Sequence, residues 1–241
     1  MFRTAISRKT EPPIEYVEGF TEFLGCKIDL SKRPFIPRPE TEYWVGKAIQ
    51  EIRSHCAFIR CLDLFAGSGC IGIAVLKHVP DARVVFAEKE KKFIQQIKKN
   101  LALNKIPSGR YRLVQPARRS PERSRGGEGG SDLFSNIPGR YDFILANPPY
   151  LATKRKRFIQ RSVLDWEPHG ALFAGPDGLL YIRKFLRGAG NHLNPNGKIY
   201  MEFDSWQKPK ITKIVRSFNF RHVEFFKDQY GKWRYIVLNN L

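Results

Sequence analysis

From Ile59 onward the sequence alternates short β-rich runs with longer helix-like runs, and this alternation restricts the fold more than any other feature. It is typical of a mostly parallel sheet with helices on both faces. The predicted strands are 59–65, 82–88, 111–115, 141–147 and 198–203, and the predicted helices lie near 70–78, 90–103 and 177–193. Two more β-rich runs, 221–226 and 233–238, predict an antiparallel hairpin that completes an α/β fold with a seven-stranded sheet.

The segment before Ile59 predicts a smaller unit. Residues 19–30, GFTEFLGCKIDL, predict a β-hairpin or two short strands, and a helix is expected to begin near Pro39. Proline suits a first helical turn because its missing amide hydrogen would have no partner there, and Glu40 and Glu42 complement the helix dipole. We therefore expect a short appendage over residues 1–38 and the main domain over residues 39–241.

Residues 115–131, QPARRSPERSRGGEGGS, interrupt the alternation. The segment is rich in Arg, Ser, Gly and Pro and has too few apolar residues to bury a core. Two interpretations stay open: a flexible surface insertion, which the composition favours, and an arm that contacts RNA.

The composition limits the class of protein. The 42 Lys and Arg against 23 Asp and Glu give a formal charge of +19, which attracts polyanions such as ribosomal RNA or an acidic protein, although a basic solvated surface explains it equally well. No apolar run reaches the roughly 18 residues of a membrane span, and the first residues lack the apolar centre of a signal peptide. We expect a cytoplasmic protein, by default a monomer. The four cysteines and five histidines are scattered, which predicts no metal site.

A glycine-rich turn predicts a nucleoside site. Residues 62–75, LDLFAGSGCIGIAV, follow a β-rich run and open a helix, with Gly67, Gly69 and Gly72 at GxGxxG spacing. Glycines there let the backbone turn tightly and approach a ligand closely, but the motif alone is weak. Glu88 ends the next predicted strand, 19 residues after Gly69, where a carboxylate can accept hydrogen bonds from both ribose hydroxyls. Together they predict nucleoside binding on a Rossmann-like sheet.

Two cofactors use such a site, NAD and S-adenosylmethionine. Asp63, two residues before the turn, favours the second, because a carboxylate can lie near its ammonium and sulfonium groups but would repel a pyrophosphate. Asp132, in SDLF, could accept a hydrogen bond from the adenine amino group, or it could be a solvated aspartate that ends the insertion. Methyl transfer is therefore the leading chemistry.

The tetrapeptide NPPY, Asn147 to Tyr150, follows a predicted strand that ends at the same edge of the sheet. The Asn147 side-chain carbonyl and the Pro148 backbone carbonyl offer two acceptors for a planar NH₂ group, and Pro148 and Pro149 stiffen the backbone that holds them. Bonding both N–H groups orients the nitrogen lone pair and stabilises the developing positive charge. We predict Asn147, Pro148 and Tyr150 as catalytic residues, with Pro149 also binding substrate and Tyr150 giving it a flat face. NPPY alone leaves open whether the acceptor is a side-chain amide or a base.

Longer motifs extend from about Glu11 to the C-terminus: FIPRPETE, DLFAGSG, YDFILANPPY, EPHGALFAGPDGLLYIRKFL and MEFDSWQ. In these motifs the chain resembles the HemK/PrmC family of class I methyltransferases, which transfer a methyl group from S-adenosylmethionine to the GGQ glutamine N(5) of peptide chain release factors, leaving S-adenosylhomocysteine. The resemblance implies that Arg38 and Glu40 to Glu42 help to close the pocket. The implied cofactor-binding residues are Phe65, Ala66, Gly67, Ser68, Gly69, Glu88, Asp132 and Leu133, and the strand-end residues Asp63 and Asn147 complete the predicted cofactor site.

The chain departs from the family in three places. The family usually has a helical N-terminal domain that grips the release factor, and almost nothing precedes Glu11 here. Docking is then expected to use the core, through the basic segment KRKRFIQR (154–161), which is otherwise an ordinary solvated helix face. Glu88 stands where the family usually has aspartate, and Asp204 stands where it has glycine.

Three classes of function stay open. Methylation of the release-factor glutamine is the leading hypothesis. A methyltransferase that acts on exocyclic amino groups of RNA or DNA bases is favoured by the charge and the Arg/Gly-rich segment, but PRPETE argues against it. A binding module without activity is the third, and the intact Gly67, Gly69, Glu88 and NPPY argue against it.

Overall fold

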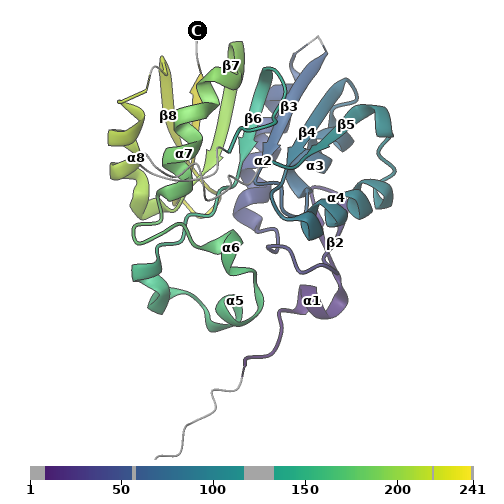
Figure 1. Cartoon of the computed structure of the whole chain (residues 1–241), viewed down its shortest axis with the longest axis vertical. Helices are drawn as coiled ribbons and strands as arrows, with labels where there is room; N and C mark the ends of the chain where they lie inside the picture. Colours follow the sequence, from purple (N-terminus) through teal and green to yellow (C-terminus); the bar gives the residue numbers. More distant parts are fainter. Residues whose placement is uncertain (1–8, 56–57, 117–132, 219, 240–241) are drawn as a thin grey trace, which may run out of the picture.

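The computed structural model describes residues 9–55, 58–116, 133–218 and 220–239. Within these ranges the main sheet has seven strands in the order β5-β4-β3-β6-β7-β9-β8 (Figure 1). β5 to β7 are parallel in this order, and β9 pairs antiparallel with both β7 and β8. The strands are β3 (Ile59–Leu64), β4 (Ala82–Ala87), β5 (Tyr111–Val114), β6 (Tyr141–Ala146), β7 (Leu193–Glu202), β8 (His222–Lys227) and β9 (Trp233–Asn239). The predicted Rossmann-like fold with its C-terminal hairpin is confirmed.

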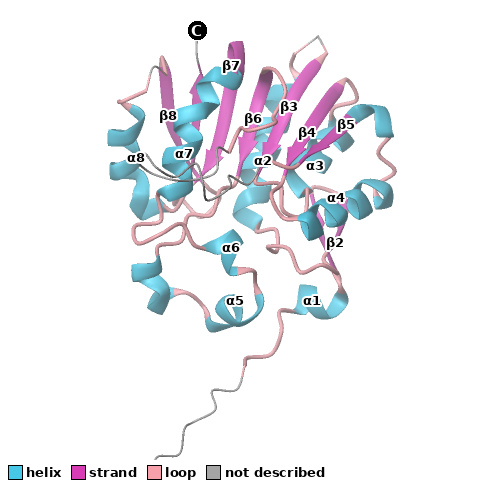
Figure 2. Cartoon of the chain, in the orientation of Figure 1, coloured by secondary structure: helices cyan, strands magenta, loops and turns pink. Residues whose placement is uncertain are grey.

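Helices cover both faces of this sheet (Figure 2). On one face lie α2 (Pro39–Arg53), α3 (Cys70–His78) and α4 (Lys91–Leu103), and on the other lie α7 (Leu180–Ala189) and α8 (Lys208–Val215). Side chains of β3 alternate between these layers, since Cys61 is buried with the first group and Leu62 with the second. A strand covered on both faces needs apolar residues on both sides, which explains the four apolar residues of β3; of its two charged residues, Arg60 is exposed and Asp63 is buried.

The sequence prediction was wrong at two elements. The predicted strand 198–203 is the second part of β7: Leu193 already pairs with Tyr141, and the ladder resumes at Lys198 after an irregular segment that contains Asn196 at φ +61°. This Pro-Asn-Gly segment has the residues of a turn, so it hid the beginning of the strand. The helix predicted over 177–193 is also shorter, because η4 (Gly190–His192) and β7 take its last residues.

The N-terminal segment packs against helices α3 and α4 of the main domain. After α1 (Ile14–Glu18), β1 (Phe20–Phe23) and β2 (Cys26–Asp29) form the predicted antiparallel pair, and α2 begins at Pro39 as expected. Phe23, Cys26 and Ile28 are buried in the same apolar cluster as α2, α3 and α4. The hairpin is therefore packed into the common core.

The chain after NPPY crosses beyond the carboxyl edge of the parallel strands (Figure 1). It forms η3 (Thr153–Phe158), α5 (Arg161–Trp166) and α6 (His169–Leu172), so the basic segment is a 3₁₀ helix and the start of α5. The Trp166 indole donates to the Thr10 carbonyl at 2.8 Å, and the Thr10 amide donates to Asp165 at 2.9 Å. These bonds tie the crossing segment to the N-terminal residues. The remaining short helices are η1 (Ser108–Arg110) and η5 (Ser205–Gln207).

Candidate active site

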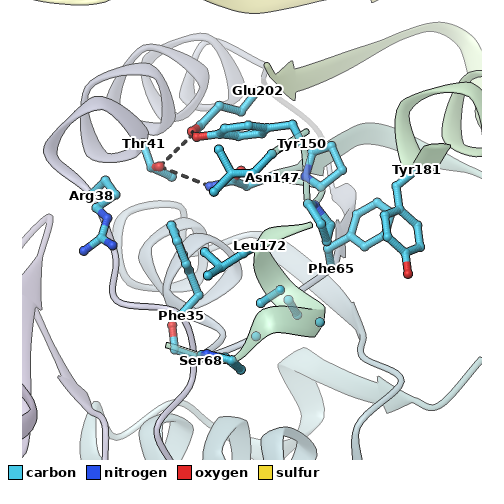
Figure 3. A pocket seen from close by; sticks show the side chains of 18 of the residues that line it. Phe35, Arg38, Thr41, Phe65, Ser68, Asn147, Tyr150, Leu172, Tyr181 and Glu202 are labelled. Carbon is cyan, nitrogen blue, oxygen red and sulfur yellow. Dashed lines mark hydrogen bonds between the residues drawn. The ribbon is translucent and has the colours of Figure 1, made fainter. Parts of the chain in front are cut away.

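A cavity of about 720 Å³ opens at the carboxyl edge of the parallel strands. Its walls come from the loops after β3, β4 and β6, from the start of α2 and from the crossing segment that contains α5 and α6 (Figure 3). Ligands of open α/β sheets bind at this edge. The predicted residues that line the cavity are Arg38, Glu40, Thr41, Phe65, Ala66, Gly67, Ser68, Glu88, Leu133, Asn147, Pro148, Pro149 and Tyr150, whereas Glu42 does not line it. Asp132 lies outside the described residues, as does most of the 115–131 segment.

The glycine-rich turn after β3 has the backbone that its sequence predicts. Gly67 and Gly69 have φ values of +54° and +81°, a region that glycine adopts without strain. Phe65 also has a positive φ, +66°, which the glycine pattern did not predict. Gly72 serves packing instead, because a Cβ there would lie 2.3 Å from the Phe86 ring on β4. The first glycines therefore shape the turn, and the third lets α3 approach the sheet.

Glu88 holds the turn from the neighbouring strand end. Its two carboxylate oxygens accept hydrogen bonds from the Gly67 amide at 2.9 Å and the Glu90 amide at 2.8 Å. Only 7% of the residue is exposed, and this burial raises the pKa of the carboxyl group. The carboxylate is thus fixed at the cavity wall, and each oxygen keeps lone-pair capacity for a ligand hydroxyl.

Asp63 lies behind the turn and is absent from the cavity wall, contrary to its predicted contact with the cofactor. It is fully buried, and its Oδ2 accepts from the Gly72 amide at 2.9 Å. Its Oδ1 has no partner among the described residues, and burial raises its pKa to about 7. Its observed contact orients the first turn of α3. Gly69 likewise shapes the turn from outside the lining.

The NPPY loop is held by side chains from three other elements. The Asn147 amide nitrogen donates to the Thr41 hydroxyl at 3.2 Å, and the Tyr150 hydroxyl donates to Glu202 at 2.9 Å (Figure 3). The Gln207 side chain donates to the Tyr150 carbonyl at 3.0 Å. Tyr150 therefore does more than present a flat face, because its hydroxyl and its backbone are both anchored.

The PRPETE segment fastens the start of α2 to its surroundings. Arg38 forms an ion pair with buried Glu167, which also accepts from the Ile36 amide at 3.2 Å. Glu42 accepts from the Leu24 amide at 2.7 Å, in the hairpin between β1 and β2. The sequence indicated a role at the pocket for Arg38 and Glu42 only through the family resemblance. The contacts show that they join α2 to the crossing segment and to the N-terminal hairpin.

Sequence reasoning missed Glu202 as a site residue. It ends β7, is 1% exposed, and lies where three donors meet at the cavity. The available signal was a lone acid, Glu202, at the end of the apolar strand KIYMEF, since buried carboxylates are rare unless they are paired.

Asp204 caps the helical segment that follows β7. Its φ is −82°, which any residue adopts, and it forms a capping box with Gln207, whose side chain accepts from the Asp204 amide at 3.0 Å. The aspartate in place of the family's glycine thus serves a cap, and the position places no special demand on the backbone.

Basic and aromatic side chains form the outer rim of the cavity. We call Arg155, Phe158 and Trp206 the rim cluster: the Arg155 guanidinium lies 5.0 Å from the centres of both rings. Phe158 is 64% exposed, and all three residues line the cavity. The predicted basic segment therefore does reach the entrance.

Two further observations concern the described residues only. Cys26, Cys61 and Cys70 are buried free thiols, as predicted for cysteines of a core, whereas Cys56 lies outside the described ranges. Those ranges contain no cluster of three His, Cys, Asp or Glu residues suited to a metal, and none of their helices is long and apolar enough to cross a membrane.

Fold and site together define a methyltransferase. Residues 49–174 match the family model described as methyltransferase small domain. Among solved structures, the hMettl16 catalytic domain in complex with an RNA hairpin has a TM-score of 0.64 at 16% identity, covering 89% of this chain and 75% of that one, which shows a shared fold.

Curated relatives give the particular family. The release factor glutamine methyltransferase of Flavobacterium psychrophilum is 31% identical over 235 residues, which span 96% of this chain and 76% of the relative. The enzyme of the same name from Streptococcus pneumoniae is also 31% identical, over 95% of this chain and 75% of its own length. The chain belongs to the release factor glutamine methyltransferase family.

Proposed function

We propose that this protein transfers a methyl group from S-adenosylmethionine to the side-chain amide nitrogen of the GGQ glutamine in a peptide chain release factor. The relatives' shared name supports the substrate. The observation that carries the chemistry is the anchored Asn147, whose amide nitrogen is bonded to Thr41 and whose carbonyl is therefore turned to the cavity.

The cavity suits a nucleoside cofactor. The small residues of the turn at Phe65 to Ser68 would let a ligand approach the backbone closely. The fixed Glu88 carboxylate would accept hydrogen bonds from the ribose hydroxyls. Leu133 offers an apolar contact for the adenine, and the Phe65 and Tyr181 rings meet edge to face at 5.8 Å on the same wall. When bound, S-adenosylmethionine supplies a methyl group on a sulfonium centre.

The protein's part in the reaction is to orient a poor nucleophile. An amide nitrogen shares its lone pair with its carbonyl group, so it reacts only when it is held in line and its developing positive charge is stabilised. Asn147 Oδ1 and the Pro148 carbonyl would accept its two N–H groups. The anchored Tyr150 would pack against the amide plane.

Docking of the release factor would use the rim cluster with the rest of the basic segment 154–161.

A specific observation also favours a second candidate function, methylation of an exocyclic amino group in RNA. Cations interleaved with exposed aromatic rings, as in the rim cluster, suit stacked bases and phosphates.

One labelling experiment separates these functions. The protein is incubated with S-adenosylmethionine carrying a radiolabelled methyl group, together with either a release factor or ribosomal RNA. We expect label in the release factor, and we expect it to disappear when the GGQ glutamine is replaced. Label in RNA alone would overturn the proposal, and bound cofactor without transfer to either substrate would indicate a binding module.

A further inference from the structure

A buried carboxylate joins three elements behind the NPPY loop. Glu202 Oε2 accepts from the Thr41 hydroxyl and from the Trp44 indole, each at 2.7 Å, while Oε1 accepts from the Tyr150 hydroxyl at 2.9 Å. Thr41 and Trp44 are three residues apart on α2, so their side chains share one face of the helix. The carboxylate therefore connects the end of β7, the start of α2 and the loop after β6.

The hydrogen-bond donors fix the direction of the whole chain of bonds. An indole N–H can only donate, so Glu202 Oε2 must be an acceptor. The Thr41 hydroxyl lies 2.7 Å from that oxygen and donates its single hydrogen to it. Its lone pairs are then free to accept from Asn147 Nδ2 at 3.2 Å (Figure 3). The nitrogen of the Asn147 amide thus faces Thr41, and Oδ1 faces the cavity.

The surrounding charges keep this arrangement in place. Burial raises the pKa of Glu202, whereas the charge of Arg234 and the three donors lower it. Arg234 is itself fixed by Asp228 at 3.0 Å. With Glu202 as a carboxylate, which the charge of Arg234 favours, Thr41 and Trp44 both donate to Oε2 and Tyr150 donates to Oε1.

We propose that Thr41 and Glu202 are positioning residues that present the Asn147 carbonyl oxygen, and not its NH₂ group, to the substrate nitrogen that receives the methyl group. Such a site selects a substrate that donates two hydrogen bonds. A primary amide satisfies it, whereas a carboxylate of the same shape places an acceptor oxygen where the NH₂ group would lie and leaves the Asn147 and Pro148 oxygens unpaired. The Asn147–Thr41–Glu202 chain therefore makes the site specific for glutamine over glutamate. The substrate in this inference rests on the proposed function.

The test compares three variants that alter the Asn147–Thr41–Glu202 hydrogen bonds at different points. Thr41→Val keeps the side-chain shape but removes the hydroxyl, Thr41→Ser keeps the hydroxyl, and Trp44→Phe removes a donor to the same Glu202 oxygen without touching Asn147. We expect Thr41→Val to lower kcat for release-factor methylation by about 10- to 100-fold with unchanged cofactor affinity. Thr41→Ser should restore most of the activity, and Trp44→Phe should cost several-fold less than Thr41→Val.

A second measurement needs no substrate. The side-chain NH₂ signal of Asn147, assigned by its loss in Asn147→Asp, should exchange slowly with water in the wild type and in Thr41→Ser, and rapidly in Thr41→Val. Melting temperatures would confirm that each variant is folded. Equal kcat in Thr41→Val and Thr41→Ser, or equal losses in Thr41→Val and Trp44→Phe, would overturn the inference. If the wild type does not methylate the release factor but the exchange pattern holds, only the proposed substrate is wrong.

Discussion

Gly178 lies against the backbone of Tyr150: a Cβ at this glycine would stand 2.2 Å from the Tyr150 carbonyl oxygen. The Gln207 side chain completes the contact, because its amide nitrogen donates to the carbonyls of both residues at 3.0 Å. Gly178 has φ +70°, so neither space nor backbone permits another residue. The motif that follows NPPY in the sequence therefore holds the NPPY loop from behind.

Gly178→Ala should consequently lower both stability and activity. The clash and the positive φ should together reduce the free energy of unfolding by at least about 2 kcal/mol, as measured by urea denaturation. Gly25→Ala is the matched control, since Gly25 has the same φ of +70° with nothing within 4 Å of its added Cβ. It should cost only the backbone strain, about 1–2 kcal/mol. Equal losses in the two variants would contradict the close contact.

Asn147→Ala should strongly reduce methyl transfer while it leaves cofactor binding largely intact. The substitution removes one of the two acceptors for the substrate NH₂ group, and removal of one such preorganised group costs about 100- to 1000-fold in kcat. The measurement is single-turnover transfer to the release factor, with cofactor affinity determined by calorimetry. Retained activity would refute the role of the Asn147 carbonyl.

Arg38→Ala should destabilise the fold more than loss of a surface ion pair does. Glu167 has only 1% of its side chain exposed, so without Arg38 its charge stays buried without a counter-charge. This should lower the free energy of unfolding by about 3–5 kcal/mol. Arg161→Ala removes a partner of Asp165 on the exposed side of α5 and should cost no more than about 1 kcal/mol. The double variant Arg38→Met with Glu167→Leu should recover much of the loss. A loss in Arg38→Ala as small as in Arg161→Ala would show that the pair contributes little.

Asp63 should make the stability of the free protein depend on pH. Its folded pKa of about 7 lies above the roughly 3.9 of an unfolded aspartate, so between these values the folded state binds more protons. Its contribution to stability is therefore complete below pH 4 and is lost as the pH rises toward 7. Asp63→Asn lacks the titrating carboxyl group but can still accept a hydrogen bond from the Gly72 amide. From pH 5 to pH 8, the free energy of unfolding of the wild type should fall relative to that of Asp63→Asn. A difference between the two proteins that stays the same at both pH values would contradict the raised pKa.

The sequence was most informative where local pattern and tertiary environment agree. The central strands β3, β4 and β6 were predicted correctly because both faces of the sheet are covered there and most of their residues are apolar and buried. The beginning of β7 was missed because its Pro-Asn-Gly segment has the local chemistry of a turn, and pairing of Leu193 with Tyr141 overrides it. α8 was not predicted, although Ile211 and Val215 lie four residues apart on its buried face.

Within the site, motifs predicted which residues gather at the cavity but not which side chains hold them. Asp63 was expected at the cofactor because it adjoins the turn, yet the turn itself covers it. Glu202 was missed because its three hydrogen-bond partners lie 52, 158 and 161 positions away in the sequence. Contacts of this kind arise from the packing of whole elements, and spacing along the chain does not record them.

Asn100 on α4 has a consequence for how small this catalytic unit can be made. Its side-chain NH₂ donates to the Ser68 carbonyl in the glycine-rich turn at 2.9 Å and to the Asp29 carbonyl at the end of β2 at 3.2 Å, while its oxygen accepts from the Asp29 amide at 2.8 Å. A chain shortened to begin at α2 would lose both hydrogen bonds between Asn100 and Asp29, and the buried amide would keep only its bond to Ser68 in the turn. The minimal autonomous enzyme should therefore begin before Phe20, and the N-terminal hairpin sets the lower limit of its length.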